Sequence, residues 1–332
     1  MNKMKKIGVS TLAGSLVAVA ANAGEMSVSG SAILTYVSED VLHQQTGNNW
    51  GTATNVKFTG TGDVNGMTVT IMTNLTDENT AATSSGLTVD MGDMGKFIFD
   101  QGMGGNGLDL YDDTTPTAWE EANDGMTGAL VLAGDSSVNT LNYSNTVGGF
   151  AINIMYDPAT GDADQEDGEA GAAGTTGSSQ SIAIGLPVGD YVEGLSMGVA
   201  QGTDELADGS STTTDIDSWV VFANYSMGPV TVGVNRAETS GGTTGHGMQQ
   251  IEGMGITFNV NDNLSVGYTN VEQEYANAGG TANVVEESTG LSLAYTMGSA
   301  TISIQNNEQD NPGGSSTAQD EERTEINLAL AF

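Results

Sequence analysis

Apolar and polar residues alternate along this chain in segments of about ten residues, and this pattern constrains the fold more than any other feature. The last eight residues, 325–332, read Glu-Ile-Asn-Leu-Ala-Leu-Ala-Phe, and residues 150–156 and 291–297 repeat the alternation. A period of two residues belongs to a β-strand whose two faces meet different surroundings. We therefore expect an all-β fold.

Sixteen such segments, an even number, can be placed along the chain, and tight turns alternate with long polar connections between them. Short turns at one end and eight long loops at the other are typical of a 16-stranded antiparallel transmembrane β-barrel, with its periplasmic turns and outer loops. The predicted strands are 25–37, 54–62, 66–75, 85–91, 95–100, 138–146, 149–157, 179–188, 192–202, 215–227, 229–238, 248–258, 263–273, 286–297, 299–307 and 322–332.

Alternation alone does not say which face of the strands lies inside, because a soluble β-sandwich shows the same pattern. After residue 23, no segment approaches the ~18 consecutive apolar residues that a membrane helix needs. A chain of this kind crosses a membrane only with strands. The asymmetry of turns and loops favours the membrane barrel.

The first 23 residues are expected to be a cleaved signal peptide. Lys3, Lys5 and Lys6 precede a short, mostly apolar stretch, 7–20, which is followed by Ala-Asn-Ala at 21–23. A basic start, a short apolar region and a small-x-small site describe a secretory signal. Cleavage leaves residues 24–332 as one barrel domain with no second domain.

The chain is strongly acidic, with a formal charge of −35. Loss of three lysines with the signal peptide gives −35 − 3 = −38. Nucleic acid is excluded as a partner because its phosphates require the lysine and arginine that are missing here. Cations are the natural counter-charges. With no cysteine, disulfides and thiol catalysis are also excluded. The four remaining basic residues are Lys57, Lys96, Arg236 and Arg323.

Three stretches resemble the Gram-negative general porins, in particular those of marine alphaproteobacteria. Residues 25–32 resemble the family's first strand, and residues 138–150 resemble its strand, tight turn and Gly-Gly-Phe entry to the next strand. The terminal Phe332 is similar to the signal that the barrel-assembly machinery reads. The resemblance implies an outer-membrane homotrimer in contact with lipid and lipopolysaccharide, whose third long loop folds into the lumen.

That loop is 101–137 in this sequence, and it has no lysine or arginine. We expect its carboxylates to form an acidic constriction that favours cations over anions. The alternative, that several of them face bulk water or cap local turns, stays open. The carboxylates in question are Asp109, Asp112, Asp113, Glu120, Glu121 and Asp124.

Strand parity places Lys57, Lys96 and Arg323 on the pore wall, where the family usually has a cluster of arginines. Three scattered basic residues cannot offset the acidic excess. Arg236 shares parity with the apolar Val232 and Val234, so we expect it on the outer face, above the apolar band, with a local bulge at this position as the alternative.

The sequence therefore predicts a water-filled channel for passive diffusion of ions and small hydrophilic solutes, without catalysis or a cofactor. Only His43 and His246 could act as histidine bases, and no nucleophile motif accompanies them. A substrate-specific channel would carry aromatic residues along the lumen, whereas parity places most of them outside. A secreted calcium-binding β-protein is the other alternative, since the acidic run 162–167 could bind Ca²⁺ weakly, but strict glycine-rich repeats are missing.

Overall fold

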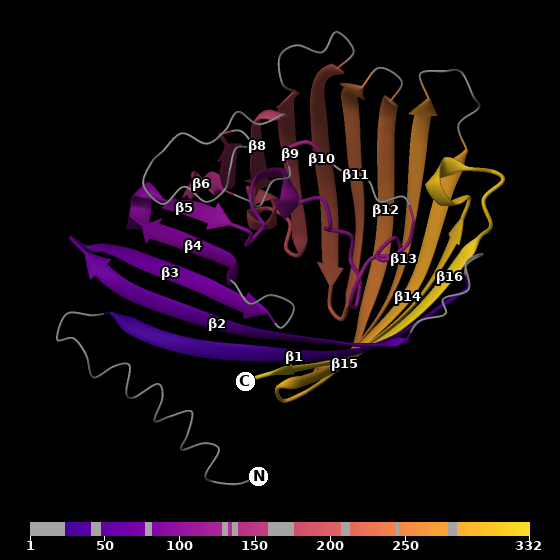
Figure 1. The fold of residues 1–332 in the computed structure, drawn as a ribbon, viewed down its shortest axis with the longest axis horizontal. Coiled ribbons are helices and arrows are strands. Elements are labelled where there is room, and N and C mark those ends of the chain that lie inside the picture. Colours follow the sequence, from indigo (N-terminus) through magenta and orange to yellow (C-terminus); the bar gives the residue numbers. More distant parts are fainter. Residues whose placement is uncertain are drawn as a thin grey trace.

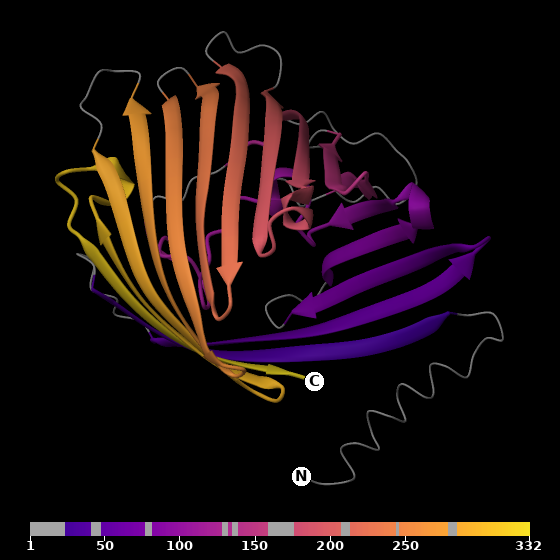
Figure 2. The ribbon, with the colours of Figure 1, turned by 180° about the vertical axis from the view of Figure 1, so that it is seen from behind.

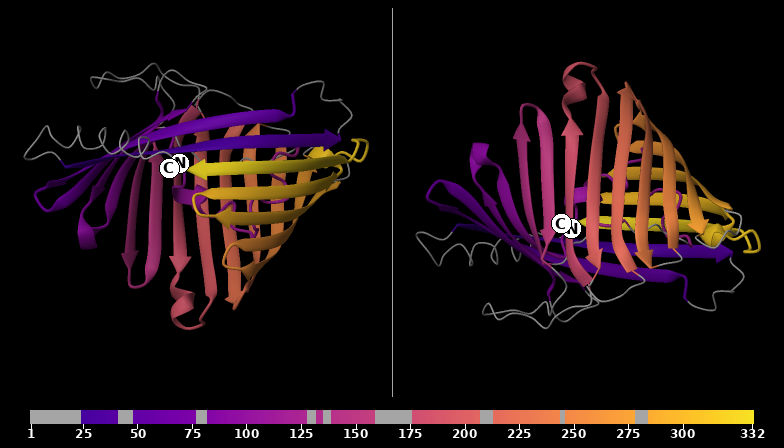
Figure 3. Two further views of the ribbon diagram at one scale, coloured as in Figure 1. Left: turned by 90° about the horizontal axis from the view of Figure 1, so that it is seen from below. Right: turned by 90° about the horizontal axis from the view of Figure 1, so that it is seen from above.

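The structure, a computed structural model, describes residues 24–40, 48–76, 82–127, 132–134, 139–158, 176–206, 213–243, 246–277 and 284–332. In this part of the chain sixteen antiparallel strands form one closed barrel (Figure 1). Each strand pairs with its neighbours in sequence, and β1 pairs with β16 to close the ring. Figure 2 shows the barrel from behind, and Figure 3 shows it from below and above.

The strands are β1 (Glu25–Asp40), β2 (Trp50–Val64), β3 (Met67–Thr76), β4 (Ala82–Asp90), β5 (Lys96–Gln101), β6 (Thr140–Val147), β7 (Phe150–Asp157), β8 (Thr176–Leu186), β9 (Leu195–Leu206), β10 (Thr213–Met227), β11 (Val230–Thr243), β12 (His246–Asn261), β13 (Leu264–Asn277), β14 (Val285–Met297), β15 (Ala300–Asp310) and β16 (Glu321–Ala331). Four short 3₁₀ helices are also described: η1 (Gly92–Met94), η2 (Gly107–Leu110), η3 (Pro187–Asp190) and η4 (Pro312–Gly314). No helix in the described part of the chain is long and apolar enough to cross a membrane.

The sixteen-stranded antiparallel barrel predicted from the sequence is confirmed, with differences at the strand ends. Strands β11 and β12 leave only residues 244–245 between them, where the sequence predicts a connection over 239–247. At this end of the barrel both strand faces carry polar residues, so alternation no longer marks the strand.

A tight turn predicted at 189–191 is also wrong. It is replaced by η3, and β9 begins at Leu195 instead of 192. Pro187 at the start of η3 has a fixed φ and no N–H, which suits the first helical turn and not a strand.

Side-chain exposure decides which face of the strands is outside. Large apolar side chains on alternate positions are open, as in Ile71 at 57 % and Leu291 at 63 %. Their polar neighbours are buried inside, as in Asn142 at 1 % and Asn307 at 1 %. A soluble monomer rarely exposes an apolar surface that continues around the molecule. Such a belt requires hydrocarbon around it, and the polar face lines the interior.

The first strand and the C-terminal residues close the barrel. The backbone N–H of Gly30 donates to the carbonyl of Phe332 at 2.8 Å, and the N–H of Phe332 donates back to Gly30 at 2.9 Å. A Cβ on Gly30 would lie 2.6 Å from the Phe332 ring, so glycine lets the ring lie close against the strand there. The terminal aromatic residue is therefore part of the β1–β16 seam.

Candidate functional site

The connection between β5 and β6 folds into the barrel; we call residues 102–139 the constriction loop, of which 102–127, 132–134 and 139 are described. It lies in front of β10–β13 in Figure 1 and behind them in Figure 2, which places it on their inner side. The N–H of Gly107 donates to Oδ1 of Asn153 on β7 at 2.6 Å. Further along, the N–H of Ala118 donates to Oγ of Ser292 on β14 at 3.1 Å. The loop therefore crosses the interior from β7 toward β16.

Inward-facing glycines on several strands make room for this crossing. A Cβ at Gly198 on β9 would lie 2.8 Å from the ring of Tyr111. At Gly255 on β12 it would lie 2.3 Å from the carbonyl oxygen of Pro116, and at Gly267 on β13 it would lie 2.6 Å from the Ala118 nitrogen. Glycine in a strand often marks a close backbone approach. These inward-facing glycines were the one feature of the sequence that could have indicated where the loop crosses the wall. We call these glycines, with Gly233, Gly253 and Gly290, the glycine track.

An apolar contact anchors the start of the loop. Leu108 is fully buried and belongs to a cluster with small or branched residues of β8–β11, including Ala183 and Val220. The ring of Tyr111 packs on the ring of Phe222, with centroids 4.8 Å apart. Strand parity could place Phe222 inside the barrel. Tyr111 lies on a loop, where no periodicity applies, so its contact with Phe222 could not be predicted. These lumenal aromatics pack the loop onto the wall.

Several of the predicted constriction carboxylates also bond within the loop. Oε1 of Glu121 accepts the Thr115 N–H at 2.8 Å, and its side chain is buried. Oδ2 of Asp124 accepts the Glu121 N–H at 3.0 Å. Asp109 accepts the Gly105 N–H, and Asp112 accepts the N–H of the next residue. Asp113 is the most exposed of the set, and Asp109, Asp112, Glu120 and Asp124 are half-buried.

The carboxylates of the second half of the loop lie close enough to perturb one another. Burial raises the pKa of Glu120 to about 7, with further increases from the charges of Glu325 and Asp124 against a decrease from Arg323. Burial likewise raises the pKa of Glu121 to about 7, and the Thr115 hydrogen bond opposes this. Desolvation also raises the pKa of Asp124. The structure thus brings together part of the predicted set, with Glu325 as an acidic neighbour that the sequence prediction missed.

Asp113 differs from this group because its side chain is exposed, whereas those of Glu120 and Asp124 are half-buried. Partial desolvation, and then the charges of Asp124 and Asp109, raise its pKa.

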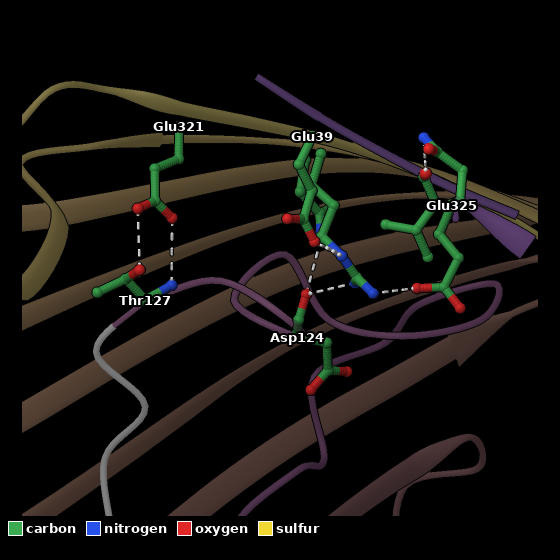
Figure 4. A network of polar contacts seen from close by, with 9 residues as sticks. Glu39, Asp124, Thr127, Glu321 and Glu325 are labelled. Carbon is green, nitrogen blue, oxygen red and sulfur yellow. Dashed lines mark hydrogen bonds and ion pairs between the residues drawn. The ribbon is translucent and has the colours of Figure 1, made fainter. Parts of the chain in front are cut away.

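Three of the four basic residues after residue 23 are engaged in ion pairs. Nζ of Lys96 lies 3.1 Å from Asp90. Arg236 is on the outer face, where it pairs with Glu252 at 2.6 Å and lies over the Trp219 ring, 5.9 Å from its centroid. Arg323 pairs with Glu39 and Glu325 inside the barrel (Figure 4).

Lys57 shares the inward parity of Asn74, its register partner on β3, and its side chain is exposed. It has no carboxylate within salt-bridge distance in the described part of the chain. Among the described residues, Lys57 is therefore the one basic side chain of the lumen that has no ion pair.

An open cavity of 670 Å³ lies beside the loop at the tight-turn end of β5–β7. Its lining includes Lys96, Leu110, Tyr111, Ser144 and Asn153, so its wall is polar and apolar in similar measure. Among the residues that the structure describes, no group of three carboxylate or histidine side chains could hold a metal ion. The acidic run 162–167 lies outside the described residues.

A closed barrel with an apolar outer belt and a polar lumen narrowed by an internal loop defines an outer-membrane channel protein. The model of the Gram-negative porin family matches residues 9–332, so the chain belongs to this family. The resemblance noted in the sequence is thereby confirmed, and so is the location in the outer membrane. Porins are channel proteins that work without a cofactor.

Solved structures support the fold at low sequence identity. OmpT of Vibrio cholerae has 14% identity and a TM-score of 0.68, over 95% of this chain and 99% of that one. An anion-selective porin from Comamonas acidovorans has 15% identity and a TM-score of 0.64, over 93% and 99% of the two chains. OmpF of Salmonella typhi, in complex with daunomycin, has 13% identity and a TM-score of 0.64, over 93% and 98%. No curated protein sequence matches this chain.

Proposed function

We propose that this porin is a general diffusion channel that prefers cations, with the constriction loop as the element that sets the preference. The observation that carries the proposal is the charge balance of the lumen. Carboxylates of the loop face or border the lumen, while Lys96 and Arg323 are paired and Lys57 alone is free among the described basic residues. A constriction with excess negative charge concentrates cations and repels anions.

The fold does not decide this preference. The similar barrel from Comamonas acidovorans is described as anion-selective. Selectivity must therefore follow from the side chains of each lumen, and the constriction loop here carries carboxylates but no lysine or arginine.

The reversal potential of single channels in a KCl gradient tests the proposal. We expect K⁺ to be more permeant than Cl⁻, and we expect Asp113→Asn to reduce the preference because Asp113 is the most exposed of the predicted loop carboxylates. Glu193→Gln is the matched control, because Glu193 is exposed in the turn before β9, away from the constriction loop. Preference for Cl⁻ in the wild-type channel contradicts the proposal.

General diffusion is favoured over a substrate-specific channel because the lumenal aromatic residues Tyr111 and Phe222 are engaged in packing. Tyr111 of the constriction loop and Phe222 of β10 pack against each other where the loop meets the wall. A sugar slide needs aromatic faces open along the path of the solute. Liposome swelling with neutral solutes of graded size should show rates that fall with size alone, and saturation by one solute would favour specificity.

We also propose that the chain forms a homotrimer through part of its apolar belt. A similar barrel, OmpT of Vibrio cholerae, has been solved in a trimer form, with 13% identity and a TM-score of 0.63 over 94% of this chain. Current steps that occur in groups of three, together with the mass of the detergent-solubilised complex, test the assembly. The signal peptide 1–23, the contacts with lipopolysaccharide and the assembly machinery, and weak Ca²⁺ binding by outer loops remain predictions.

A further inference from the structure

The guanidinium of Arg323 on β16 contacts β1, β16 and the constriction loop, through Glu39, Glu325 and Asp124, which are labelled in Figure 4. Nε lies 3.3 Å from Oε1 of Glu39 on β1, and Nη2 lies 2.5 Å from Oε2 of Glu325 on β16. Nη1 donates to the carbonyl oxygen of Asp124 in the constriction loop at 3.3 Å. The side chain is only 16% exposed. Arg323 is therefore no free charge on the pore wall, because it links the barrel seam to the loop.

The chain next to Asp124 is shaped to meet this guanidinium. Gly125 has φ of 71°, a conformation that residues with a side chain seldom adopt. A Cβ on Gly125 would lie 2.0 Å from Nη1 of Arg323. The positive φ favours glycine at this position, and the short distance shows that the loop backbone passes directly beside the guanidinium.

Neighbouring residues of β15 and β16 hold the same stretch of loop, 120–127, which we call the loop tip. Gln305 donates to the carbonyl of Glu121 at 2.6 Å, and Gln309 donates to the carbonyl of Thr127 at 3.0 Å. Thr127 donates its hydroxyl to Glu321 at 2.9 Å. Of the side chains that donate to the loop tip, Arg323 is the charged one among the described residues, and charged donors form the stronger hydrogen bonds.

We propose that Arg323 is a positioning residue that fixes the loop tip against the β1–β16 seam and so holds the constriction in one open geometry. Its effect on ion preference rests on the proposed function, because it also keeps Glu120 and Asp124 in place beside the ion path. Its effect on the steadiness of the current does not depend on which ion the channel prefers.

Two variants separate positioning from charge. Arg323→Gln removes the charge and the fork of donors. Arg323→Lys keeps the charge but cannot contact Glu39, Glu325 and the Asp124 carbonyl together, since lysine lacks the planar fork. We expect both variants to show at least a threefold increase in open-channel current noise, with brief closures. Only Arg323→Gln should shift the reversal potential toward stronger cation preference.

Lys96→Gln is the matched control, because Lys96 is also a lumenal cation in an ion pair but its partner is Asp90 on β4, far from the loop tip in the strand order. It should leave the noise at the wild-type level. Unchanged heat resistance of the barrel on gels would show that the β1–β16 seam still closes in each variant.

Cross-linking supplies an independent test, since the chain has no cysteine of its own. In Arg323→Gln, the added pair Thr127→Cys and Glu321→Cys can be bridged by a bifunctional methanethiosulfonate reagent and released by reductant. The bridge should lower the current noise to the wild-type level, and reduction of the bridge should bring the increased noise back. Wild-type noise in both Arg323 variants, or noise that the bridge leaves unchanged, would overturn the positioning role. If the wild-type channel prefers Cl⁻ and both Arg323 variants are noisy, only the proposed ion preference is overturned.

Discussion

Ion preference should strengthen as the pH rises through neutrality, because two carboxylates of the constriction loop titrate there. The pKa values of Glu120 and Glu121 are both raised to about 7, mainly by burial. Groups of this pKa are ~3% ionised at pH ~5.5 and ~97% ionised at pH ~8.5. The constriction therefore gains almost two negative charges over this interval, whereas ordinary exposed glutamates are already ionised at its lower end.

The same titration destabilises the constriction loop in its position against the barrel wall, which we call the docked state. The pKa of Glu121 lies above the ordinary value of 4.5, so the docked loop binds more protons than a freely solvated segment between pH 4.5 and about 7. Stability of the docked state thus falls as the pH rises through this window and levels off above it. For the buried Glu121 the shift corresponds to roughly 3 kcal/mol. We expect a more strongly cation-preferring but noisier channel at pH ~8.5 than at pH ~5.5.

Reversal potentials in one KCl gradient at three pH values measure this effect. The double variant Glu120→Gln and Glu121→Gln should abolish most of the pH dependence, while Glu193→Gln in an exposed turn should keep it. Equal reversal potentials at all pH values in the wild type, or an unchanged pH dependence in the double variant, would refute the reasoning.

Three further predictions concern the wall of the barrel. Gly255→Leu places a side chain where a Cβ is already 2.3 Å from Pro116, so the loop should leave the glycine track; single-channel conductance should change, and thermal unfolding should show a loss of about 1–3 kcal/mol. Ile71→Arg puts a charge on the apolar belt, where it is 57% exposed, and should cost about 2–4 kcal/mol if the side chain is near the bilayer midplane, measured by urea unfolding in lipid vesicles. Lys57→Gln should strengthen cation preference more than Lys96→Gln does, because Lys96 is already paired with Asp90; equal shifts in reversal potential would show that the ion pair does not screen Lys96.

Local pattern was enough to predict the strands, because a period of two residues is written directly in each segment. Residues 325–331 of the terminal segment and the segment 150–156 both lie in strands of the structure. Strand ends were less accurate, as at β11 and β12, because the apolar band no longer imposes alternation beyond the membrane. Exposure of Ile71 and burial of Asn142 settled the direction of the faces, which alternation left open.

The path of the constriction loop could not be predicted, because distant residues determine it. Gln305 reaches the Glu121 carbonyl across 184 positions, and Arg323 reaches Asp124 across 199. Parity places Arg323 inside but says nothing of its partners. The inward glycines were visible in the sequence, and their shared role became clear only when the loop was seen against them.

Modification of engineered cysteines on β2 tests the central claim most directly, since Val56 and Lys57 are adjacent and face opposite sides of the wall. A charged, water-soluble methanethiosulfonate reagent should change the single-channel current of Lys57→Cys and leave that of Val56→Cys unchanged. A current change at Val56→Cys with none at Lys57→Cys would mean that the apolar side chains line the water and the polar side chains do not.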